Sequence, residues 1–355
     1  MKNNLVKLTD ELVRFRSVDS AGSLGELKRI VDFVEKRVKR CEGVFVDRLV
    51  VKGKPCLIVT FEKNQKKPKV FLNGHLDVVE GKENQFKPVL RSGRLYGRGT
   101  HDMKGGCAVM IKLIEEFAKK KVRPDAGFMF VTDEEEFGAQ SEEFFKKGYR
   151  PELLVTLEST DERIVTETKG IYWMEGEITG KAAHCAYSWN GENPLEDFNK
   201  GLSRFFKKFP PLRKNVWRRG FNIGCVQMGD RFNVIPEKLT FKLDVRYLPG
   251  EDMKKLTREV KSCFGKNTKW KVRKLEPAHT KAKDMKLIKL LKKSSGLAFG
   301  REPYATDARF FAAGGVNSIV FGPRGGGMHS DSEWVDVKSL EKIYEALFEF
   351  ILRLP

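Results

Sequence analysis

Five residues of this sequence have side chains that commonly bind divalent metal ions. His75 closes the apolar run "VFLNGH", and the others lie in "GRGTHDMKGG" (Asp102), "TDEEEFG" (Glu135), "LLVTLEST" (Glu158) and "GGGMHSDSEWV" (His329). Two imidazoles and three carboxylates form a hard-to-borderline ligand set that suits zinc and, less tightly, cobalt or manganese. One open zinc site uses fewer ligands, whereas two ions that share a bridging carboxylate account for all five.

Two further acidic residues suit supporting roles beside these ligands. Asp77 follows His75 by two residues, so on an extended backbone the two side chains point to the same side. A ligating histidine usually donates its second ring N–H to a carboxylate, which fixes the tautomer. Glu134 precedes Glu135, and one of two adjacent carboxylates can bind metal while its neighbour acts as the general base on the attacking water.

The elements that must position these side chains are strands that end at one rim of a sheet. The runs "KVFLNG", "AGFMFV" and "ELLVTL" are apolar and are followed directly by His75, by Glu134 with Glu135, and by Glu158. In α/β sheets functional side chains gather beyond the carboxyl ends of the strands. The glycines on both sides of Asp102 allow the backbone to approach an ion closely, and they precede the helical pattern "CAVMIKLIEEFAKKK".

The sequence pattern changes between residues 171 and 279. This stretch predicts two helices and four strands in the order strand, helix, strand, strand, helix, strand, which is the order of a small α+β domain. The preceding and following segments share the α/β style. With 355 residues the chain is long enough for two domains, so we predict a discontinuous α/β domain (1–170 and 280–355) with 171–279 inserted.

The formal charge of +19 permits nucleic acid, an anionic surface or anionic substrates as partners. The basic clusters, such as "EKNQKKPK" and "FFKKFPPLRKNVWRR", fall in predicted loops or at helix ends, and no sequence signature of a nucleic-acid-binding fold accompanies them. A solvated basic surface is the simpler interpretation, so nucleic acid is not an expected partner. The charge would also attract substrates that carry carboxylates.

No membrane span and no secretion signal are expected. The sequence lacks a run of roughly 18 uncharged apolar residues, and its first residues form an amphipathic pattern instead of an apolar block. The six cysteines are scattered without metal-site spacing, and most stand in apolar runs, as is typical of reduced thiols. These features predict a cytoplasmic protein.

Each candidate residue also has an ordinary structural explanation. An acid at a strand end is usually only solvated, and a single histidine is more often structural than a ligand. The joint pattern is harder to explain in this way, because three strands end in acids or histidine, an aspartate lies between glycines, and a His-x-Asp pair follows a strand.

Eight motifs of the sequence resemble, in the same order, those of the dinuclear zinc aminoacylase and exopeptidase family, metallopeptidase family 20. They are "GHLDVVEG", "RLYGRGTHDMKGG", "TDEEEFGAQ", "LLVTLEST", "GKAAHCAYSWNGENPL", "RFNVIPEKLTFKLDVRY", "ATDARFF" and "GGGMHSDSEWV". The resemblance extends from about residue 70 to the C-terminus. The family includes succinyl-diaminopimelate desuccinylases, acetylornithine deacetylases, aminoacylases and glutamate carboxypeptidases.

The resemblance implies a site for two Zn²⁺ ions per subunit, with Co²⁺ or Mn²⁺ as possible substitutes. His75 and Glu158 would hold one ion, Glu135 and His329 would hold the other, and Asp102 would bridge them. The fold implied is a zinc-exopeptidase-like catalytic domain, with a mixed central sheet flanked by helices, and an inserted α+β ferredoxin-like dimerisation and lid domain.

The resemblance also implies catalytic and substrate-binding residues. Asp77 would support His75, and Glu134 would take a proton from the attacking water and hand it to the leaving amine. A homodimer formed through residues 171–279 would bring His184 into the partner's active site to stabilise the oxyanion. The residues implied to contact the substrate are Asn233 and Arg246, which hold its carboxylate, and Thr306.

Three positions depart from the family pattern. Ser159 follows Glu158 where the family commonly has proline, and His101 precedes Asp102 where a small residue is typical. "PYATDARFF" lacks the Ser-Gly-Gly that desuccinylases carry before the equivalent of Thr306. His101 is either a partner that contacts the metal ligands or, as we expect, a residue at the entrance of the site. These departures leave the identity of the substrate undecided.

The expected function is metal-dependent hydrolysis that removes a succinyl or acetyl group from an N-acyl amino acid. An alternative within the family is a dipeptidase or carboxypeptidase, which uses the same metals and base on a short peptide that carries a carboxylate. A more distant alternative is a non-catalytic binding module. A lost metal ligand or base would favour that module, and neither is lost here.

Overall fold

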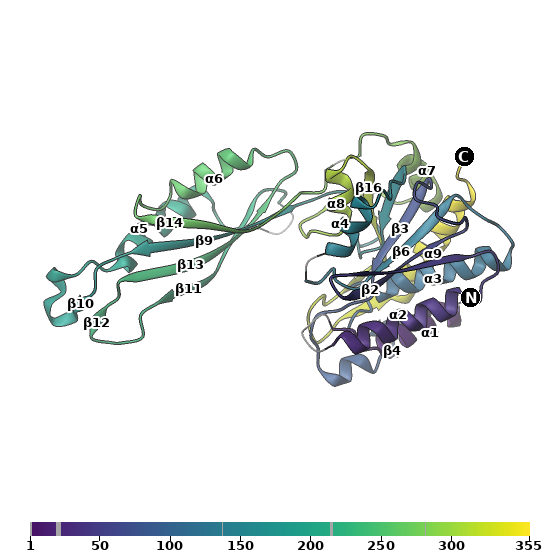
Figure 1. The fold of residues 1–355 in the computed structure, drawn as a ribbon, viewed down its shortest axis with the longest axis horizontal. Coiled ribbons are helices and arrows are strands. Elements are labelled where there is room, and N and C mark those ends of the chain that lie inside the picture. Colours follow the sequence, from purple (N-terminus) through teal and green to yellow (C-terminus); the bar gives the residue numbers. More distant parts are fainter. Residues whose placement is uncertain (1, 19–22, 137, 214–215, 281) are drawn as a thin grey trace. The chain divides into compact units, whose positions relative to one another are not determined.

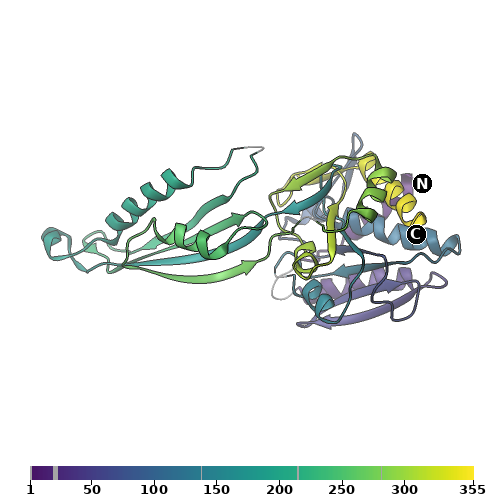
Figure 2. The same ribbon diagram turned by 90° about the horizontal axis from the view of Figure 1, so that it is seen from above.

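A computed structural model describes residues 2–18, 23–136, 138–213, 216–280 and 282–355. The chain divides into two compact units (Figures 1 and 2). Unit 1 comprises Met1–Glu167, His279–Glu302 and Thr306–Pro355, and unit 2 comprises Thr168–Ala278 and Pro303–Ala305. The short segment 303–305 therefore groups with unit 2, although the sequence pattern places it in the discontinuous domain.

Unit 1 is built on an eight-stranded mixed sheet with the order β1-β2-β6-β3-β7-β16-β8-β15. Its strands are β1 (Phe45–Val51), β2 (Lys54–Thr60), β6 (Ala126–Val131), β3 (Val70–His75), β7 (Leu153–Thr156), β16 (Asn317–Phe321), β8 (Ile164–Thr168) and β15 (Phe299–Glu302). Strand β3 runs parallel to both β6 and β7, and β7 runs parallel to β16. The carboxyl ends of these strands consequently meet at one rim of the sheet.

Helices cover both faces of this sheet. The helices on one face are α1 (Lys2–Val13), α2 (Leu24–Val38), α3 (Lys104–Lys119), α7 (Lys286–Ser295) and α9 (Val337–Leu352), and those on the other are α4 (Ala139–Lys146) and α8 (Ala308–Ala313). Successive side chains of a strand point to opposite faces. In β2, for example, Leu57 and Val59 join the core beneath the first group of helices, whereas Ile58 joins the core beneath the second.

A second, smaller sheet of unit 1 brings two distant segments together. It has the order β17-β18-β5-β4, with β4 (Val89–Arg91), β5 (Arg94–Tyr96), β17 (Gly325–Gly326) and β18 (Trp334–Asp336). The short helix η1 (Glu83–Phe86) precedes β4. Because β18 pairs with β5, the segment that follows β5 lies beside the loop that connects β17 to β18. These two segments carry Asp102 and His329.

Unit 2 contains a four-stranded antiparallel sheet with the order β11-β13-β9-β14. The elements along the chain are β9 (Gly170–Thr179), α5 (Pro194–Lys208), β11 (Gly220–Met228), β13 (Lys238–Tyr247), α6 (Met253–Lys261) and β14 (Thr268–Glu276). Both helices begin at side-chain caps, because Asn193 accepts a hydrogen bond from Leu195 N and Asp252 accepts one from Lys254 N. Phenylalanines of α5 and aliphatic residues of α6 pack on alternate residues of β9 and β13.

The predicted fold class is confirmed. Unit 1 has a mixed central sheet between layers of helices, and unit 2 follows the β-α-β-β-α-β order of a ferredoxin-like α+β unit. Across the described ranges, each helix is too short or too polar to span a lipid bilayer.

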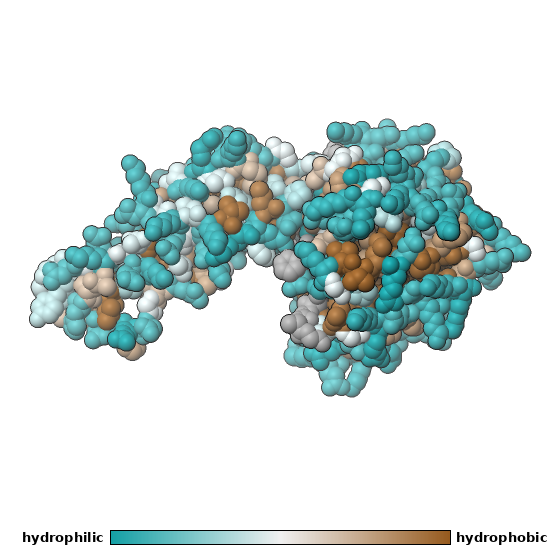
Figure 3. All heavy atoms as spheres, viewed as in Figure 1, coloured by the Kyte–Doolittle hydropathy of each residue, from teal (hydrophilic) through white to brown (hydrophobic). Residues whose placement is uncertain are grey.

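A two-stranded sheet of β10 (Ala183–His184) and β12 (Val234–Ile235), with the short helix η2 (Cys185–Asn190), completes unit 2. Three aromatic side chains in and beside these elements, Tyr187, Trp189 and Phe232, are exposed. Most other atoms on the visible faces of the two units belong to hydrophilic residues, and hydrophobic atoms form limited patches (Figure 3).

Candidate metal centre

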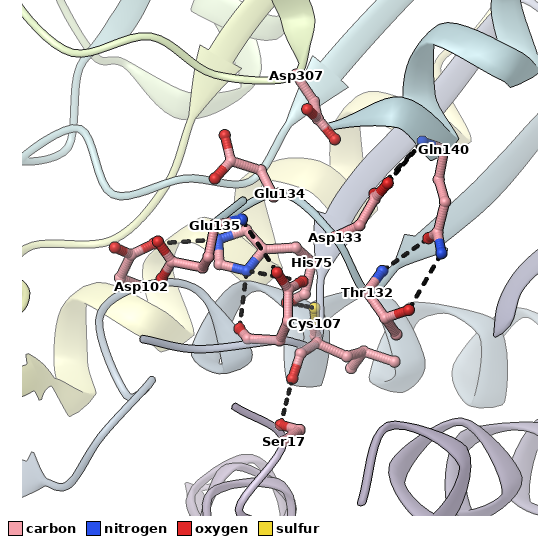
Figure 4. Close-up of polar contacts among 12 residues, drawn as sticks. Ser17, His75, Asp102, Cys107, Thr132, Asp133, Glu134, Glu135, Gln140 and Asp307 are labelled. Carbon is pink, nitrogen blue, oxygen red and sulfur yellow. Dashed lines mark hydrogen bonds and ion pairs between the residues drawn. The ribbon is translucent and has the colours of Figure 1, made fainter. Parts of the chain in front are cut away.

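The candidate ligands of unit 1 converge at the carboxyl rim of the large sheet. His75 is the last residue of β3, Glu135 lies in the turn after β6, and Glu158 follows β7 by two residues. Asp102 lies two residues before α3 and points toward His75 (Figure 4). His329 comes from the loop between β17 and β18. The structure thus brings these five residues together.

The carboxylate of Asp102 is shared between the two histidines. Its Oδ1 lies 3.1 Å from Nε2 of His75, and its Oδ2 lies 3.0 Å from Nε2 of His329. Each histidine also has a second carboxylate nearby, Glu158 at 3.4 Å from His75 and Glu135 at 3.3 Å from His329. This arrangement has two groups of donors with one carboxylate between them.

The second ring nitrogen of His75 fixes its tautomer. Nδ1 lies 2.9 Å from the main-chain oxygen of Asp77 and 3.5 Å from the Oδ1 atom of the same residue. A carbonyl oxygen only accepts hydrogen bonds, so Nδ1 carries a hydrogen, and Nε2 is the nitrogen that would bind a metal ion once it is deprotonated. Asp77 is fully buried, and its Oδ2 accepts a hydrogen bond from the main-chain N of Glu135. Asp77 therefore connects the loops of two candidate ligands.

His329 differs from the other candidate ligands in exposure and backbone conformation. Its side chain is 51% exposed, whereas that of His75 is 1% exposed, so the site opens to solvent on the His329 side. The backbone of His329 has a φ of 59°, in the left-handed region that non-glycine residues seldom adopt. Such conformations persist where surrounding contacts hold them, and they are concentrated at functional sites.

Glu134 lies beside the ligand cluster without belonging to the two pairs described above. One of its carboxylate oxygens lies within 4.8 Å of ligand atoms of His75 and Glu158. In Figure 4 Glu134 lies on the side of Asp307. The guanidinium of Arg309 lies 3.8 Å from a carboxylate oxygen of each of these two acids. A carboxylate in this place can reach a water molecule held by the cluster.

The cluster concentrates carboxyl groups in a buried place. Burial raises the pKa of Glu135, and burial together with nearby Asp307 raises the pKa of Glu134 well above its ordinary value. Burial acts to lower the pKa of His75, but the neighbouring carboxylates, Glu158 first, raise it well above the usual range. Oxygen and imidazole donors held this close fit two divalent cations, which would relieve the repulsion among the acids.

We predict that metal binding releases protons at neutral pH. The contacts with Asp102 and Glu135 raise the pKa of His329 to about 10, and burial together with Asp102 raises the pKa of Glu158 to about 8. Both groups hold protons at pH 7 without metal, and both must lose them to become ligands. The apparent metal affinity should therefore fall as the pH falls. Titration calorimetry in buffers of different ionisation enthalpy should show at least about one proton released per chain, and release of none would contradict this.

The structure places three of the predicted residues in unit 2. His184 is exposed in β10, and its Nδ1 accepts a hydrogen bond from Ala186 N. The exposed Asn233 lies beside it, because Cys185 N donates to the main-chain oxygen of Asn233. Arg246 lies in β13, where its Nε donates to Asp244 Oδ2 at 3.0 Å. The metal cluster itself lies wholly in unit 1.

Two other residues singled out in the sequence lie in unit 1. Thr306 is fully buried next to Asp307, and among the described residues its hydroxyl has no hydrogen-bond partner. His101 is half-buried, with a buried ring Nδ1 that packs close to Gly325. The ring of His101 is thus partly buried in unit 1, and its expected place at the entrance of the site stays a prediction.

Two residues that contact the site, Arg309 and Glu333, were not predicted from the sequence. Arg309 lies beside Glu134. It belongs to the motif "ATDARFF", in which only Thr306 was predicted to contact the substrate. Glu333 accepts hydrogen bonds from the main-chain N of both His101 and Asp102. Glu333 stands in the motif "GGGMHSDSEWV", four residues after His329. Its contact with Asp102 was not predictable from this motif, because more than half of the chain separates the two residues in sequence.

Residues 71–353 match the sequence model of the family described as "Peptidase family M20/M25/M40". Among curated proteins, a succinyl-diaminopimelate desuccinylase of Sulfurovum sp. (strain NBC37-1) is 26% identical over 98% of each chain. A probable carboxypeptidase of Aspergillus clavatus is 29% identical, over 59% of this chain and 56% of its own.

Solved structures show the same fold. A tripeptidase from Staphylococcus aureus has a TM-score of 0.82 at 18% identity and covers 99% of this chain and 98% of its own. An M20 family metallo-carboxypeptidase from Sulfolobus solfataricus has a TM-score of 0.77 at 17% identity and covers 98% of each chain. At these identities the structural similarity establishes the fold alone.

Proposed function

The chain belongs to peptidase family M20/M25/M40 and is a hydrolase of amide bonds; from this premise we propose that it removes a succinyl or acetyl group from an N-acyl amino acid, with two metal ions bound. The carboxylate of Asp102, which directs one oxygen to His75 and the other to His329, is the observation that carries the two-metal assignment. The similarity to a desuccinylase over 98% of both chains supports the acyl substrate.

The residues of the centre suit the chemistry of amide hydrolysis. Zn²⁺ ions, or Co²⁺ or Mn²⁺ in their place, would polarise the amide carbonyl and lower the pKa of the attacking water. Glu134 takes a proton from that water as the C–O bond forms, and it delivers the proton to the nitrogen as the C–N bond breaks. Burial and Asp307 raise the pKa of Glu134 in the metal-free protein, and bound cations would lower it toward the range that suits proton transfer. Asp77 keeps His75 in the tautomer that leaves Nε2 available.

Residues of unit 2 complete the proposal. We propose a homodimer formed through residues 171–279, in which His184 reaches the partner's active site and donates a hydrogen bond to the oxyanion. Arg246 and Asn233 hold the substrate carboxylate, since the planar guanidinium fork matches a carboxylate in shape and charge. Thr306, which belongs to unit 1, is a further proposed contact. A cytoplasmic location agrees with the six cysteines, all of which are free thiols.

His184→Ala should lower kcat by on the order of a hundredfold or more, as is typical for a lost oxyanion donor. KM should change much less, because the hydrogen bond strengthens only as the oxyanion forms. Steady-state kinetics on metal-loaded protein measures both constants. Ser188→Ala in the same exposed segment is the control. An unchanged kcat in His184→Ala would exclude the oxyanion role.

The arrangement between subunits has its own test. When His184→Ala and Arg246→Ala proteins are mixed and allowed to exchange subunits, each heterodimer contains one active site with both residues intact if they come from different subunits. Recovered activity would support the dimer proposal. Two inactive parents that stay inactive after verified subunit exchange would contradict it.

A peptidase is the second candidate function. The segment before Thr306 lacks the Ser-Gly-Gly of desuccinylases, and a probable carboxypeptidase is 29% identical to part of this chain. The catalytic residues would be the same, and only the contacts with the acyl or amino-acid side chain would differ.

A substrate panel separates the two candidates. Protein loaded with zinc or cobalt should be assayed on N-succinyl-diaminopimelate, N-acetylornithine and a set of dipeptides. Preference for an N-acyl substrate supports the proposal, and preference for dipeptides supports the alternative. Absence of activity on all of them, with two metals bound, would contradict the proposed substrate class.

A further inference from the structure

Glu333 is a buried carboxylate that contacts the main chain of a metal ligand. Its Oε1 accepts hydrogen bonds from the main-chain N of His101 at 3.0 Å and of Asp102 at 3.1 Å. Its Oε2 lies 2.7 Å from Nη1 of Arg98. The side chains of Glu333 and Arg98 are 1% and 3% exposed. One oxygen thus accepts hydrogen bonds from two main-chain N–H groups, and the other pairs with the guanidinium of Arg98.

The peptide group between His101 and Asp102 is held from both ends. Glu333 accepts from its N–H, and the hydroxyl of Ser159 donates to its carbonyl oxygen at 2.7 Å. Fixing both ends of a planar peptide fixes its orientation. The position of the Asp102 Cα, from which the carboxylate extends, is thereby fixed. Ser159 itself follows the ligand Glu158.

Glu333 also joins the segments of two ligands. It lies four residues after His329 in the loop that ends at β18, and its main-chain oxygen accepts a hydrogen bond from Gly97 N at 3.1 Å. The carboxylate and the carbonyl of one residue therefore tie the His329 loop to the segment 97–102. A displacement of this residue would move Asp102 relative to His329.

A purely structural ion pair is the alternative explanation. Buried ion pairs often contribute little net stability, because desolvation offsets the Coulombic attraction. One oxygen of Glu333 accepts hydrogen bonds from the main-chain N–H groups of His101 and Asp102, so Glu333 does not form a bidentate pair with Arg98. An ion pair needed only for stability has no reason to be placed on the backbone of a bridging ligand.

We propose that Glu333, anchored by Arg98 and assisted by Ser159, is a positioning residue that fixes the bridging carboxylate of Asp102 and so sets the affinity of both metal positions. The inference rests on the two-metal centre of the proposed function. Because Asp102 faces both histidines, its misplacement should weaken both positions together.

The test is metal binding by the Glu333→Gln variant. Glutamine keeps an acceptor oxygen but loses the charge that pairs with Arg98, so the side chain should shift. Zinc affinities at both positions, measured by competition with a chromophoric chelator, should fall by about 10- to 100-fold, which is typical for residues that orient metal ligands. The visible absorption of the cobalt-loaded protein should also change, because it reports the geometry around the ion. A role confined to stability would leave both the affinities and the spectrum of the folded protein unchanged.

Glu115→Gln is the matched control. Glu115 also pairs with an arginine, Arg37, at 2.6 Å, but it lies about three turns into α3 from the end near Asp102. This variant should bind both metals as the wild type does. Thermal unfolding of all metal-free variants separates loss of folding from loss of affinity.

The outcomes discriminate between the inference and its premise. If the wild type fails to bind two ions, the two-metal premise fails. If the wild type binds two ions and folded Glu333→Gln binds both with unchanged affinity, the inference alone is overturned. If Glu333→Gln does not fold, the Ser159→Ala variant tests the inference in its place. Severalfold weaker metal binding at both positions would support the positioning of Asp102, and wild-type affinity would overturn it.

Discussion

Glu134→Gln is expected to lose roughly a thousandfold in kcat while both metal ions stay bound, a loss within the range for a deleted general base. Glutamine has the same shape as glutamate, but its amide cannot accept and return a proton at neutral pH. Turnover should therefore fail at proton transfer, with little change in the ligand set. Steady-state kinetics and metal analysis of the same preparation measure the two effects.

The surroundings of Glu134 explain why this carboxylate suits the role. Burial and the nearby Asp307 raise its pKa, whereas His75 and Arg309 act to lower it. Bound cations would lower it further, toward the neutral range in which a base exchanges protons most effectively. Arg309, whose side chain is only 4% exposed, contributes to this balance after His75.

Glu136→Gln provides the control for Glu134. Glu136 lies two residues further along the same acidic run, where it is 45% exposed and pairs with Lys54 at 2.8 Å. Removing this surface pair should leave kcat near the wild-type value, since exposed ion pairs contribute little. Wild-type turnover in metal-loaded Glu134→Gln would show that another group is the base.

The sequence predicted the rim of the site because strand ends are local features. His75, Glu135 and Glu158 each follow an apolar run, and the parallel pairing of β3 with β6 and β7 then brings the three side chains to one rim. The β-α-β-β-α-β order of unit 2 was likewise predicted from the spacing of apolar residues, which alternate in strands such as β9 and β13. Both inferences need only the periodicity of the chain.

Features that depend on pairing between distant segments could not be read in this way. The contact of Glu333 with Asp102 exists because β18 pairs with β5, more than 200 residues away in the sequence. The position of Asp77 beside His75 was predictable from an extended backbone, but the main-chain hydrogen bond at 2.9 Å and the link to Glu135 N were not. Such contacts follow from tertiary packing, which a local pattern does not encode.

Asp102→Asn should weaken zinc binding at both positions, by at least about a hundredfold, the upper end of the range for residues that only orient ligands. An asparagine offers one oxygen and an NH₂ group, and the latter is a donor that cannot take the place of the second carboxylate oxygen. Because Oδ1 faces His75 and Oδ2 faces His329, neither orientation of the amide serves both positions. Metal content after dialysis and chelator competition measure the loss.

The control for Asp102 is Asp331→Asn, which changes an exposed carboxylate in the His329 loop that pairs with Lys82. This variant should keep both ions.

The contacts of Asp102 with His329 and His75 lower its pKa despite burial. The carboxylate therefore stabilises the metal-free fold above the ordinary pKa of aspartate, and this stability is lost as the pH falls. Unfolding of metal-free Asp102→Asn should therefore be measured alongside. If one position of the folded variant kept wild-type affinity, that ion would not depend on Asp102, and the two positions would not share a bridge.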